Sequence, residues 1–414
     1  MSRVLILLFF TSLLLLIDFY VFSGFKTLIS NSNNGTQKFL KNIYWLVSAV
    51  NIALIIIFNI LTPQKFWTLR AVIMTFIVAQ YLGKFIWLCF LFIDDFIRFI
   101  KLIVSYFTVE KTSSTGGISR SDFLVKAGAI AGSGLIASLG WGIARGAYNY
   151  KIHRKTIHLK NLPNSFDGIK IVQISDIHSG SFWNKEAVER GVKMAIDQNP
   201  DIVFFTGDLV NNEAKEMEPW IDTFAKIQAP MGVFSIFGNH DYGDYVFWNS
   251  IDEKTKNIEY LKNIHKKLGW NLLLNQNVKL TKNEESIGII GVENWSNRGR
   301  FKKYGNMELA TNDMGNVAVK LLLSHDPSHW RGEILKKYPD IDIMFAGHTH
   351  GMQFGVELGK YKWSPVKYMY PEWADLHQSG NQFLYVNRGF GFIGYPGRFG
   401  ILPEITLIEL KRKS

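Results

Sequence analysis

The chain has 414 residues, more than one small domain needs and enough for a membrane part and a catalytic part. Its formal charge of +11 is unevenly spread, because residues 1–150 hold 13 Lys and Arg against 5 Asp and Glu, whereas residues 151–414 hold 33 against 30. The nearly balanced second part disfavours a nucleic-acid partner, and the single cysteine, Cys89, excludes an internal disulfide and any thiolate metal site there.

Four apolar segments come first in the chain, and each is long enough to cross a hydrocarbon core of about 30 Å. They lie at 4–22, 43–61, 69–93 and 123–148. We interpret all four as membrane spans, and the excess of positive charge around them makes the lipid bilayer an expected partner. The first segment could instead be a signal peptide, but its apolar run is long and lacks a clear cleavage site.

The fourth segment is less apolar than the others and rich in small residues. Its Gly128–Gly132 and Gly142–Gly146 pairs have the spacing that lets membrane helices approach closely. An interfacial or re-entrant segment is the alternative interpretation. A polar stretch at 108–122 is expected to connect it to the third span.

Four spans place the N-terminus and the second part of the chain on the same side of a bacterial inner or plasma membrane. Lys and Arg near the spans are divided equally between the two sides, so the positive-inside rule gives no decision. A basic cluster directly after the last span favours the cytoplasmic side for residues 151–414; it consists of Lys151, Arg154, Lys155 and Lys160.

After residue 150 the pattern changes to short apolar runs that alternate with helical ones, which is typical of an α/β domain with a layered sheet. Five runs are nearly continuous in apolar residues, as in strands covered on both faces: 169–175, 201–206, 232–237, 319–324 and 341–346. Residues 184–199 predict an amphipathic helix with Asn184 as its N-cap. We therefore expect two domains, an all-α membrane region at 1–150 and an α/β domain at 151–414.

Each of the five expected strands is followed by side chains that can bind a metal. In chain order they are Asp176-Ile177-His178, Gly207-Asp208, Gly238-Asn239-His240-Asp241, His325 and Gly347-His348-Thr349-His350. Open α/β sheets place ligands beyond the carboxyl ends of their strands. Imidazoles, carboxylates and an amide oxygen without sulfur suit Mn²⁺, Fe or Zn²⁺. Seven of these residues are candidate ligands, which is too many for one ion and fits two ions that share a carboxylate; they are Asp176, His178, Asp208, Asn239, His325, His348 and His350.

Taken singly, Asp176, Asp208 and Asn239 could be turn residues or helix caps, which is the commonest role of such residues after a strand. Together with histidines at the ends of the expected strands, they favour a metal centre. A non-enzymatic membrane protein with a vestigial site is an alternative, but such a site usually loses one of its ligands, and all are present here.

The series D-x-H, G-D, G-N-H-D, H and G-H-x-H across residues 176–350 resembles the calcineurin-like metallophosphoesterase family. The resemblance implies a β-sandwich flanked by helices and a binuclear hydrolase. It implies one metal held by Asp176, His178, Asp208 and His350, and a second held by Asp208, Asn239, His325 and His348, with Asp208 bridging. His240 would not bind metal but would face the leaving group.

The chemistry expected of such a site is hydrolysis of a phosphoester. Two cations bind the phosphoryl oxygens and lower the pKa of a bridging water, which gives hydroxide at neutral pH. His240 can donate a proton to the leaving oxygen, and Asp241 could orient it.

Two later stretches, 296–305 and 387–400, combine arginine with aromatic residues. They could be solvated loops; we instead expect a rim in which Arg298, Arg388 or Arg398 holds phosphate and aromatic rings support an apolar substrate. The second stretch also resembles the C-terminal end of the family's membrane-linked branch, which includes bacterial phosphodiesterases and UDP-2,3-diacylglucosamine pyrophosphatases. A lipid-linked phosphoester or pyrophosphate is therefore the expected substrate, and the alternative is a phosphodiesterase or phosphatase that acts on soluble substrates.

Overall fold

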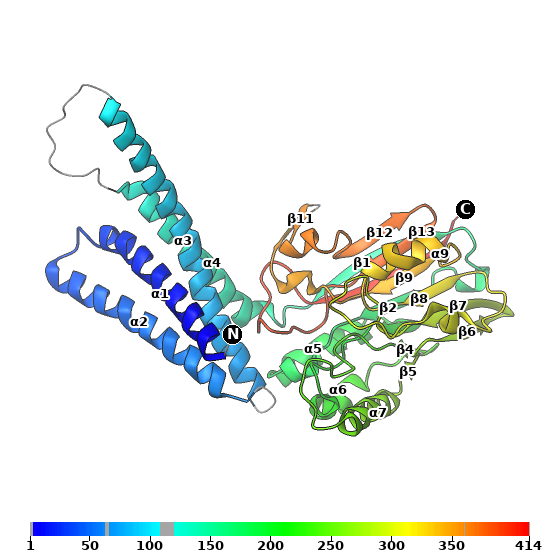
Figure 1. Ribbon diagram of the computed structural model, residues 1–414. Helices are drawn as coiled ribbons and strands as arrows, with labels where there is room; N and C mark the ends of the chain where they lie inside the picture. The colour runs from blue at the N-terminus through cyan, green and yellow to red at the C-terminus, as the bar shows by residue number, and fades with distance from the viewer. Residues whose placement is uncertain (1–2, 63–65, 108–119, 360, 414) are drawn as a thin grey trace. The chain divides into compact units, whose positions relative to one another are not determined.

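The computed structural model describes residues 3–62, 66–107, 120–359 and 361–413. The chain divides into two compact units, a helical unit Met1–Trp141 and a catalytic unit Gly142–Ser414 (Figure 1). The sequence places this boundary a few residues later, after residue 150. Most of the polar connection expected at 108–122 lies outside the described residues.

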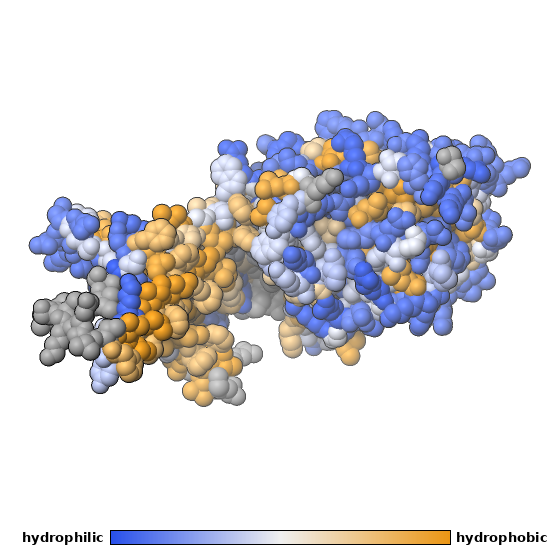
Figure 2. Space-filling model, turned by 90° about the horizontal axis from the view of Figure 1, so that it is seen from above, coloured by the Kyte–Doolittle hydropathy of each residue, from blue (hydrophilic) through white to orange (hydrophobic). Residues whose placement is uncertain are grey.

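The described part of the helical unit contains α1 (Arg3–Leu28), α2 (Asn34–Ile60), α3 (Trp67–Phe107) and α4 (Asp122–Trp141). Four segments are long and apolar enough to cross a membrane, the last of them running from Asp122 to Gly146. The third extends to Phe107, well beyond the end expected from the sequence. Apolar residues cover most of the visible surface of this unit (orange in Figure 2), as a lipid-facing surface requires.

The two glycine pairs of the fourth segment have different roles. Gly128 and Gly132 are buried, and a Cβ at Gly132 would overlap the backbone of Gly83 in α3, so this pair lets α4 approach α3 closely as predicted. Gly142 and Gly146 instead begin and end a π-helical turn that belongs to the catalytic unit. There a Cβ at Gly146 would overlap the carbonyl oxygen of Arg398, so this pair does not pack membrane helices.

The helical unit buries one ion pair between its helices. Asp18 of α1 is fully buried, and Nζ of Lys84 in α3 lies 2.5 Å from its Oδ1. The hydroxyl of Tyr81 donates to its Oδ2 at 3.0 Å, and that of Tyr44 donates to its backbone carbonyl at 2.8 Å. Three helices are therefore joined through one aspartate.

The catalytic unit is a β-sandwich of two six-stranded sheets, with strand orders β1-β14-β2-β3-β4-β5 and β12-β13-β9-β8-β7-β6. The strands of the first sheet are β1 (Lys151–Leu159), β14 (Glu404–Arg412), β2 (Lys170–Ile174), β3 (Ile202–Phe205), β4 (Val233–Ser235) and β5 (Asn271–Leu272). Those of the second are β12 (Asp375–Ser379), β13 (Gln382–Val386), β9 (Ile343–Ala346), β8 (Lys320–Leu323), β7 (Glu285–Gly291) and β6 (Gln276–Lys282). A separate hairpin pairs β10 (Val356–Leu358) with β11 (Tyr361–Trp363).

Helices cover the outer faces of the sandwich. The first sheet is covered by α5 (Lys185–Ile196), α6 (Ile221–Phe224) and α7 (Ile251–Leu268), and the second by α8 (Met307–Thr311) and α9 (Leu335–Lys337). Strand β3 shows why its run is continuously apolar: Ile202 and Phe204 enter the core between the sheets, while Val203 and Phe205 pack under the helices. The expected β-sandwich flanked by helices, preceded by about four apolar helices, is confirmed.

Strand direction brings the ligand-bearing turns to one edge of the sandwich. Strands β2, β3 and β4 are parallel neighbours in one sheet, and β8 and β9 are parallel neighbours in the other. Their carboxyl ends therefore meet, as expected for a ligand site in such sheets. The helix expected at 184–199 is also confirmed as α5, and its N-cap Asn184 accepts a hydrogen bond from the backbone of Ala187.

Candidate metal centre

The turns after three of the five strands, β2, β3 and β9, hold their polar residues in an unusual backbone conformation. Positive φ angles occur at Asp176 (53°), His178 (49°), Asp208 (60°), His348 (71°) and His350 (50°). Residues with a Cβ rarely adopt this region, and each instance costs about 1–3 kcal/mol. The fold therefore maintains local strain at this position, which is typical of a functional site.

In the part of the chain that the structure describes, two groups of buried or partly buried side chains lie after strands β2, β3, β8 and β9, and in each group the ligand atoms lie within 4.8 Å of one another. The first group is Asp176, His178 and His350. Nε2 of His350 lies 3.0 Å from Nε2 of His178 and 3.2 Å from Oδ1 of Asp176. Two imidazole nitrogens and a carboxylate oxygen thus face one point.

The second group is Asp208, His325 and His348. Nε2 of His325 lies 3.1 Å from Oδ2 of Asp208 and 3.3 Å from Nδ1 of His348. Oδ1 of Asn239 lies 3.2 Å from the same nitrogen of His325, so the amide oxygen joins this group.

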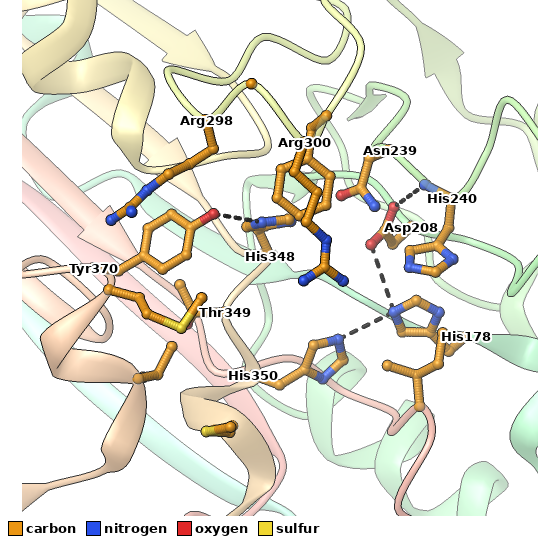
Figure 3. A pocket seen from close by; sticks show the side chains of 16 residues that line it. His178, Asp208, Asn239, His240, Arg298, Arg300, His348, Thr349, His350 and Tyr370 are labelled. Carbon is orange, nitrogen blue, oxygen red and sulfur yellow. Dashed lines mark hydrogen bonds and ion pairs between the residues drawn. The ribbon is translucent and has the colours of Figure 1, made fainter. Parts of the chain in front are cut away.

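One oxygen of Asp208 lies between the two groups. Its Oδ2 is 3.1 Å from Nε2 of His325. The same oxygen is 3.5 Å from Nε2 of His178 (Figure 3). Its Oδ1 accepts a hydrogen bond from the backbone of His240 at 2.9 Å, which fixes the carboxylate plane. This is the position that a bridging ligand between two cations would occupy.

Neighbouring groups hold the ligand side chains in orientations that suit a metal. Nδ1 of His325 donates to the carbonyl of Thr206 at 2.7 Å, so Nε2 is the ring nitrogen that faces the second group and is the one that would bind a cation. The hydroxyl of Tyr370 lies 3.0 Å from Nε2 of His348, so Nδ1 of that ring faces the centre. The amide nitrogen of Asn239 donates to the hydroxyl of Tyr245 at 2.9 Å, which turns the amide oxygen inward.

Burial and mutual charge set the protonation of the site. Burial alone would raise the pKa of Asp176 and Asp208, but neighbouring imidazoles (His350 for Asp176 and His325 for Asp208) lower both instead. Burial lowers the pKa of His178 and His348. Burial would also lower the pKa of His325, but the charge of Asp208 outweighs it and raises the pKa to about 10. A bound cation would displace the proton that Asp208 holds on His325, and ionised carboxylates beside neutral imidazoles are then the state that binds it, so this donor set fits two divalent metal ions.

His240 and Asp241 follow the metal-competent Asn239 in the chain but face different ways. His240 lines the pocket, and its Nδ1 lies 2.7 Å from the carbonyl of Asn211. The Asp241 carboxylate is buried and accepts backbone hydrogen bonds, among them those from Asp208 and Leu209 at 2.8 Å. The prediction that Asp241 orients His240 is therefore wrong: the carbonyl of Asn211 has that role, and Asp241 shapes the Asp208 turn.

The predicted arginine rim is only partly present. Arg298 lines the pocket, whereas Arg388 and Arg398 are 0% and 1% exposed and lie inside the domain. Arg388 forms an ion pair with Glu404 at 2.5 Å, and Arg398 donates to the carbonyls of Gly391 and Arg388. The prediction of a rim position for Arg388 and Arg398 is wrong because the sequence does not reveal that the loop containing them folds inward.

A cavity of about 460 Å³ opens over the two groups. Beside His178, Asp208, Asn239, His240, His348 and His350, its lining includes two sets that the sequence did not single out. One is polar, Arg300 and Tyr370, and the other is apolar, namely Met352, Val366, Met369 and Ile393. Figure 3 shows Arg300 reaching into the pocket with His348 and Tyr370 on one side and His240 on the other. Arg300 lies in the stretch 296–305 that combines arginine with aromatic residues, so the sequence offered a signal for it, but the apolar set is scattered along the chain.

Comparison with known proteins agrees with this geometry. Residues 169–352 match the family model described as calcineurin-like phosphoesterase, and residues 2–147 match one described as the probable transmembrane domain of calcineurin-like phosphoesterases. An uncharacterized metallophosphoesterase of Bacillus subtilis, YkuE, is 30% identical over 71% of this chain and 98% of its own length. The chain is a calcineurin-like metallophosphoesterase. This metallophosphoesterase is a membrane protein and a metal-dependent phosphoester hydrolase.

Two further relatives carry informative names. The zebrafish "transmembrane protein with metallophosphoesterase domain" is 28% identical over 66% of this chain, and the match spans 60% of the zebrafish protein's own length. The "UDP-2,3-diacylglucosamine pyrophosphatase LpxG" of Chlamydia trachomatis is 28% identical over 60% of this chain and 86% of its own length. The calcineurin-like family uses divalent metals, which agrees with the two groups of ligands described above.

Proposed function

We propose that the enzyme hydrolyses a phosphoester or pyrophosphate bond of a lipid-linked substrate at the surface of the bilayer. The observation that carries this proposal is the composition of the pocket. Potential metal ligands and apolar side chains line the same cavity of about 460 Å³. A phosphate joined to an acyl chain has the two kinds of surface that such a cavity binds.

Part of the apolar lining is open to solvent, and the stretch of chain that holds it has further exposed apolar side chains. Met352 and Met369 line the cavity and are 53% and 46% exposed. In the same stretch of chain, Leu358 and Tyr368 are 72% and 76% exposed. Large exposed apolar side chains that gather beside a pocket commonly mark a binding surface. We assign this surface to an acyl chain of the substrate.

The residues of the two groups would hold the metal ions in the assignment expected from the family. The first ion would be held by Asp176, His178, Asp208 and His350, and the second by Asp208, Asn239, His325 and His348. Two divalent ions, with Mn, Fe and Zn as the candidates, would supply Lewis acidity at the phosphoryl oxygens and lower the pKa of a bound water.

His240 has the role of moving a proton at the leaving oxygen. The carbonyl of Asn211 engages Nδ1, so Nε2 is the nitrogen left to act in the pocket. Contact between the rings of His240 and Tyr245, with centroids 4.6 Å apart, limits rotation of the imidazole. A positioned imidazole of this kind contributes about 10²–10⁴-fold to rate.

The name of the chlamydial relative identifies the first compound to test. Full-length enzyme in detergent with Mn²⁺ should hydrolyse UDP-2,3-diacylglucosamine faster than its deacylated analogue. Met369→Gln should lower this preference, because it places an amide on the acyl surface. Ile251→Gln is the matched control, since Ile251 is exposed and apolar but does not line the pocket. Equal rates on the two compounds would favour an enzyme for soluble phosphoesters, and a preference for the deacylated compound would sink the lipid proposal.

The catalytic unit is proposed to face the cytoplasm of a bacterial inner or plasma membrane. The basic cluster after the last span supports this side. In right-side-out vesicles, residues 151–414 should resist added protease and become accessible only after lysis. Cleavage in intact vesicles would place the catalytic unit on the outer side.

A further inference from the structure

A short loop places two arginines over the metal centre. Arg298, Gly299, Arg300 and Phe301 lie between β7 and α8, and all four line the pocket. The guanidinium carbon of Arg298 is 4.9 Å from the ring centroid of Tyr370, and that of Arg300 is 5.3 Å from the ring of Phe301. Both cations are therefore supported by aromatic faces at the pocket wall.

Arg300 reaches across the site. Figure 3 shows its side chain in the pocket, with His348 and Tyr370 on one side and His240 on the other. Tyr370 in turn contacts His348, a proposed ligand of the second metal. Arg300 therefore lies among the side chains that would hold this metal and act on the substrate.

The two lysines that follow in the chain have partners, whereas Arg298 and Arg300 form no ion pair with a carboxylate among the described residues. Lys302 forms an ion pair with Asp244 at 2.8 Å, and Nζ of Lys303 lies 4.0 Å from the ring centroid of Trp295. Among the described residues, no carboxylate lies within ion-pair distance of Arg298 or Arg300. Cations that line a cavity without an acidic partner are available for an anionic ligand.

The ends of the loop are fixed, so the arginines are not on a free strand of chain. The backbone N–H of Asn297 donates to Oγ of Ser328 at 2.9 Å. The hydroxyl of Tyr304 donates to Asp244 at 2.7 Å, and its ring stacks on Tyr242 with centroids 3.8 Å apart. The loop thus presents its cations from anchored positions.

The charge already present at the centre indicates what these cations bind. Two divalent ions would bring four positive charges to a ligand set whose carboxylates are Asp176 and Asp208. A phosphodiester contributes one negative charge, which those ions neutralise without help. Two additional guanidinium groups therefore match additional negative charge on the substrate.

We propose that Arg298 and Arg300 form a subsite for a second phosphate of the substrate, next to the phosphate that is hydrolysed. The enzyme then prefers diphosphate diesters to diesters of a single phosphate. This inference rests on the proposed function and specifies its substrate class. Guanidinium groups suit the role because their paired N–H groups match two phosphate oxygens.

The test compares a diphosphate diester with a diester of a single phosphate, and each variant's ratio is compared with the wild-type ratio so that the other differences between the two substrates cancel. The lipid pair is CDP-diacylglycerol and phosphatidylglycerol, and the soluble pair is UDP-glucose and bis(p-nitrophenyl) phosphate. For each pair we define a ratio, the kcat/KM for the diphosphate divided by the kcat/KM for the single phosphate. Arg298→Gln and Arg300→Gln should each lower this ratio by about 10-fold or more. Arg298→Lys should recover part of the ratio. Lys303→Gln, the matched control, removes a cation of the same stretch that does not line the pocket, and it should leave the ratio within about twofold.

Binding provides a readout that is independent of turnover. Calorimetry on the full-length, metal-loaded protein should give a Kd for methylenediphosphonate that weakens about 10-fold in either glutamine variant, with a smaller change for methylphosphonate. Unchanged ratios and unchanged diphosphonate affinity in both variants would overturn the subsite. If the wild type hydrolyses only the soluble pair, the lipid proposal fails while the soluble ratio still decides the subsite. If it hydrolyses none of the four compounds, the proposed function fails and the binding measurement decides.

Discussion

Each unit of the chain buries ionisable side chains, and the two units satisfy them in different ways. In the helical unit, the carboxylate of Asp18 is met by Lys84 and Tyr81, so donors and acceptors are matched within the cluster. In the catalytic unit, Nε2 of His178 faces Nε2 of His350 at 3.0 Å, and Nε2 of His325 faces Nδ1 of His348 at 3.3 Å. Ring nitrogens that converge on one point, with carboxylate oxygens beside them, are costly to bury without a cation.

The difference teaches how to distinguish a structural cluster from a binding site. A matched cluster lowers its own energy and holds its helices together, and its loss is expected to appear as lost stability. A converging cluster is stabilised by what it binds, and its loss is expected to appear as lost metal and lost rate. Four substitutions test this distinction, in order of decreasing expected effect.

Asp208→Ala is expected to have the largest effect. One oxygen of Asp208 lies beside both groups, so its loss should weaken both metal sites. Metal analysis should show fewer than two ions per chain. The loss in kcat/KM should exceed the loss caused by removing a general acid, which is about 10²–10⁴-fold. Asp197→Ala, which removes an exposed carboxylate, is the control. An unchanged metal content in Asp208→Ala would contradict the bridging assignment.

His240→Ala should keep its metals and lose about 10²–10⁴-fold in kcat, because the ring acts on the leaving oxygen and not on a cation. Metal analysis and steady-state kinetics on the same preparation measure both quantities. Loss of metal in this variant would make His240 a ligand, against the present assignment.

Lys84→Met should destabilise the helical unit, because it leaves the Asp18 carboxylate buried without its cation. Removing one partner of a buried ion pair costs about 3–5 kcal/mol, and thermal unfolding in detergent measures it. The double variant Asp18→Leu/Lys84→Met should recover much of that loss. Metal content should stay unchanged in both; loss of metal would show that the two clusters are not independent.

Tyr245→Phe should have the smallest effect. It removes the hydroxyl that accepts from the Asn239 amide, so the amide oxygen is no longer held toward the second group. Metal affinity there should weaken by about 10-fold, the lower end for a residue that orients a ligand. Tyr260→Phe, which removes an exposed hydrogen bond to Glu218, is the control. Equal metal affinity in the two variants would assign the orientation of Asn239 to His325 alone.

The strands that carry the site were predictable because their apolar runs are buried on both faces, as Ile202 to Phe205 illustrate. Strand β1 was missed because its outward residues are polar: Arg154, Thr156 and His158 are exposed. The ligand residues could be predicted because histidine, aspartate and asparagine directly follow the apolar runs that form the strands. Their positive φ angles depend on how each turn packs, which spacing does not encode.

The other features of the site could not be predicted, because they depend on the direction in which each side chain points. Asp241 and His240 are adjacent in sequence, yet one carboxylate turns inward to backbone N–H groups while the ring turns to the pocket. Arg398 and Arg298 look equivalent as arginines among aromatics, but the first is buried among carbonyls and the second lines the pocket. The direction in which a loop folds depends on contacts with residues far away in the chain. Neither the periodicity nor the composition of the loop predicts those contacts.

The contact at Gly146 has a consequence for releasing the enzyme from its anchor. The backbone N–H of Arg398 donates to the carbonyl of Gly142 at 3.1 Å, and Tyr150 packs on Phe390 with ring centroids 4.4 Å apart. Arg398 in turn donates to the loop that follows Arg388, and that loop bonds back to the Asp176 turn. A protease cut or an expression boundary placed after residue 150 would therefore remove part of the catalytic fold. A soluble fragment that keeps its first metal site intact has to begin at or before Gly142, so the end of the anchor and the start of the enzyme are the same residues.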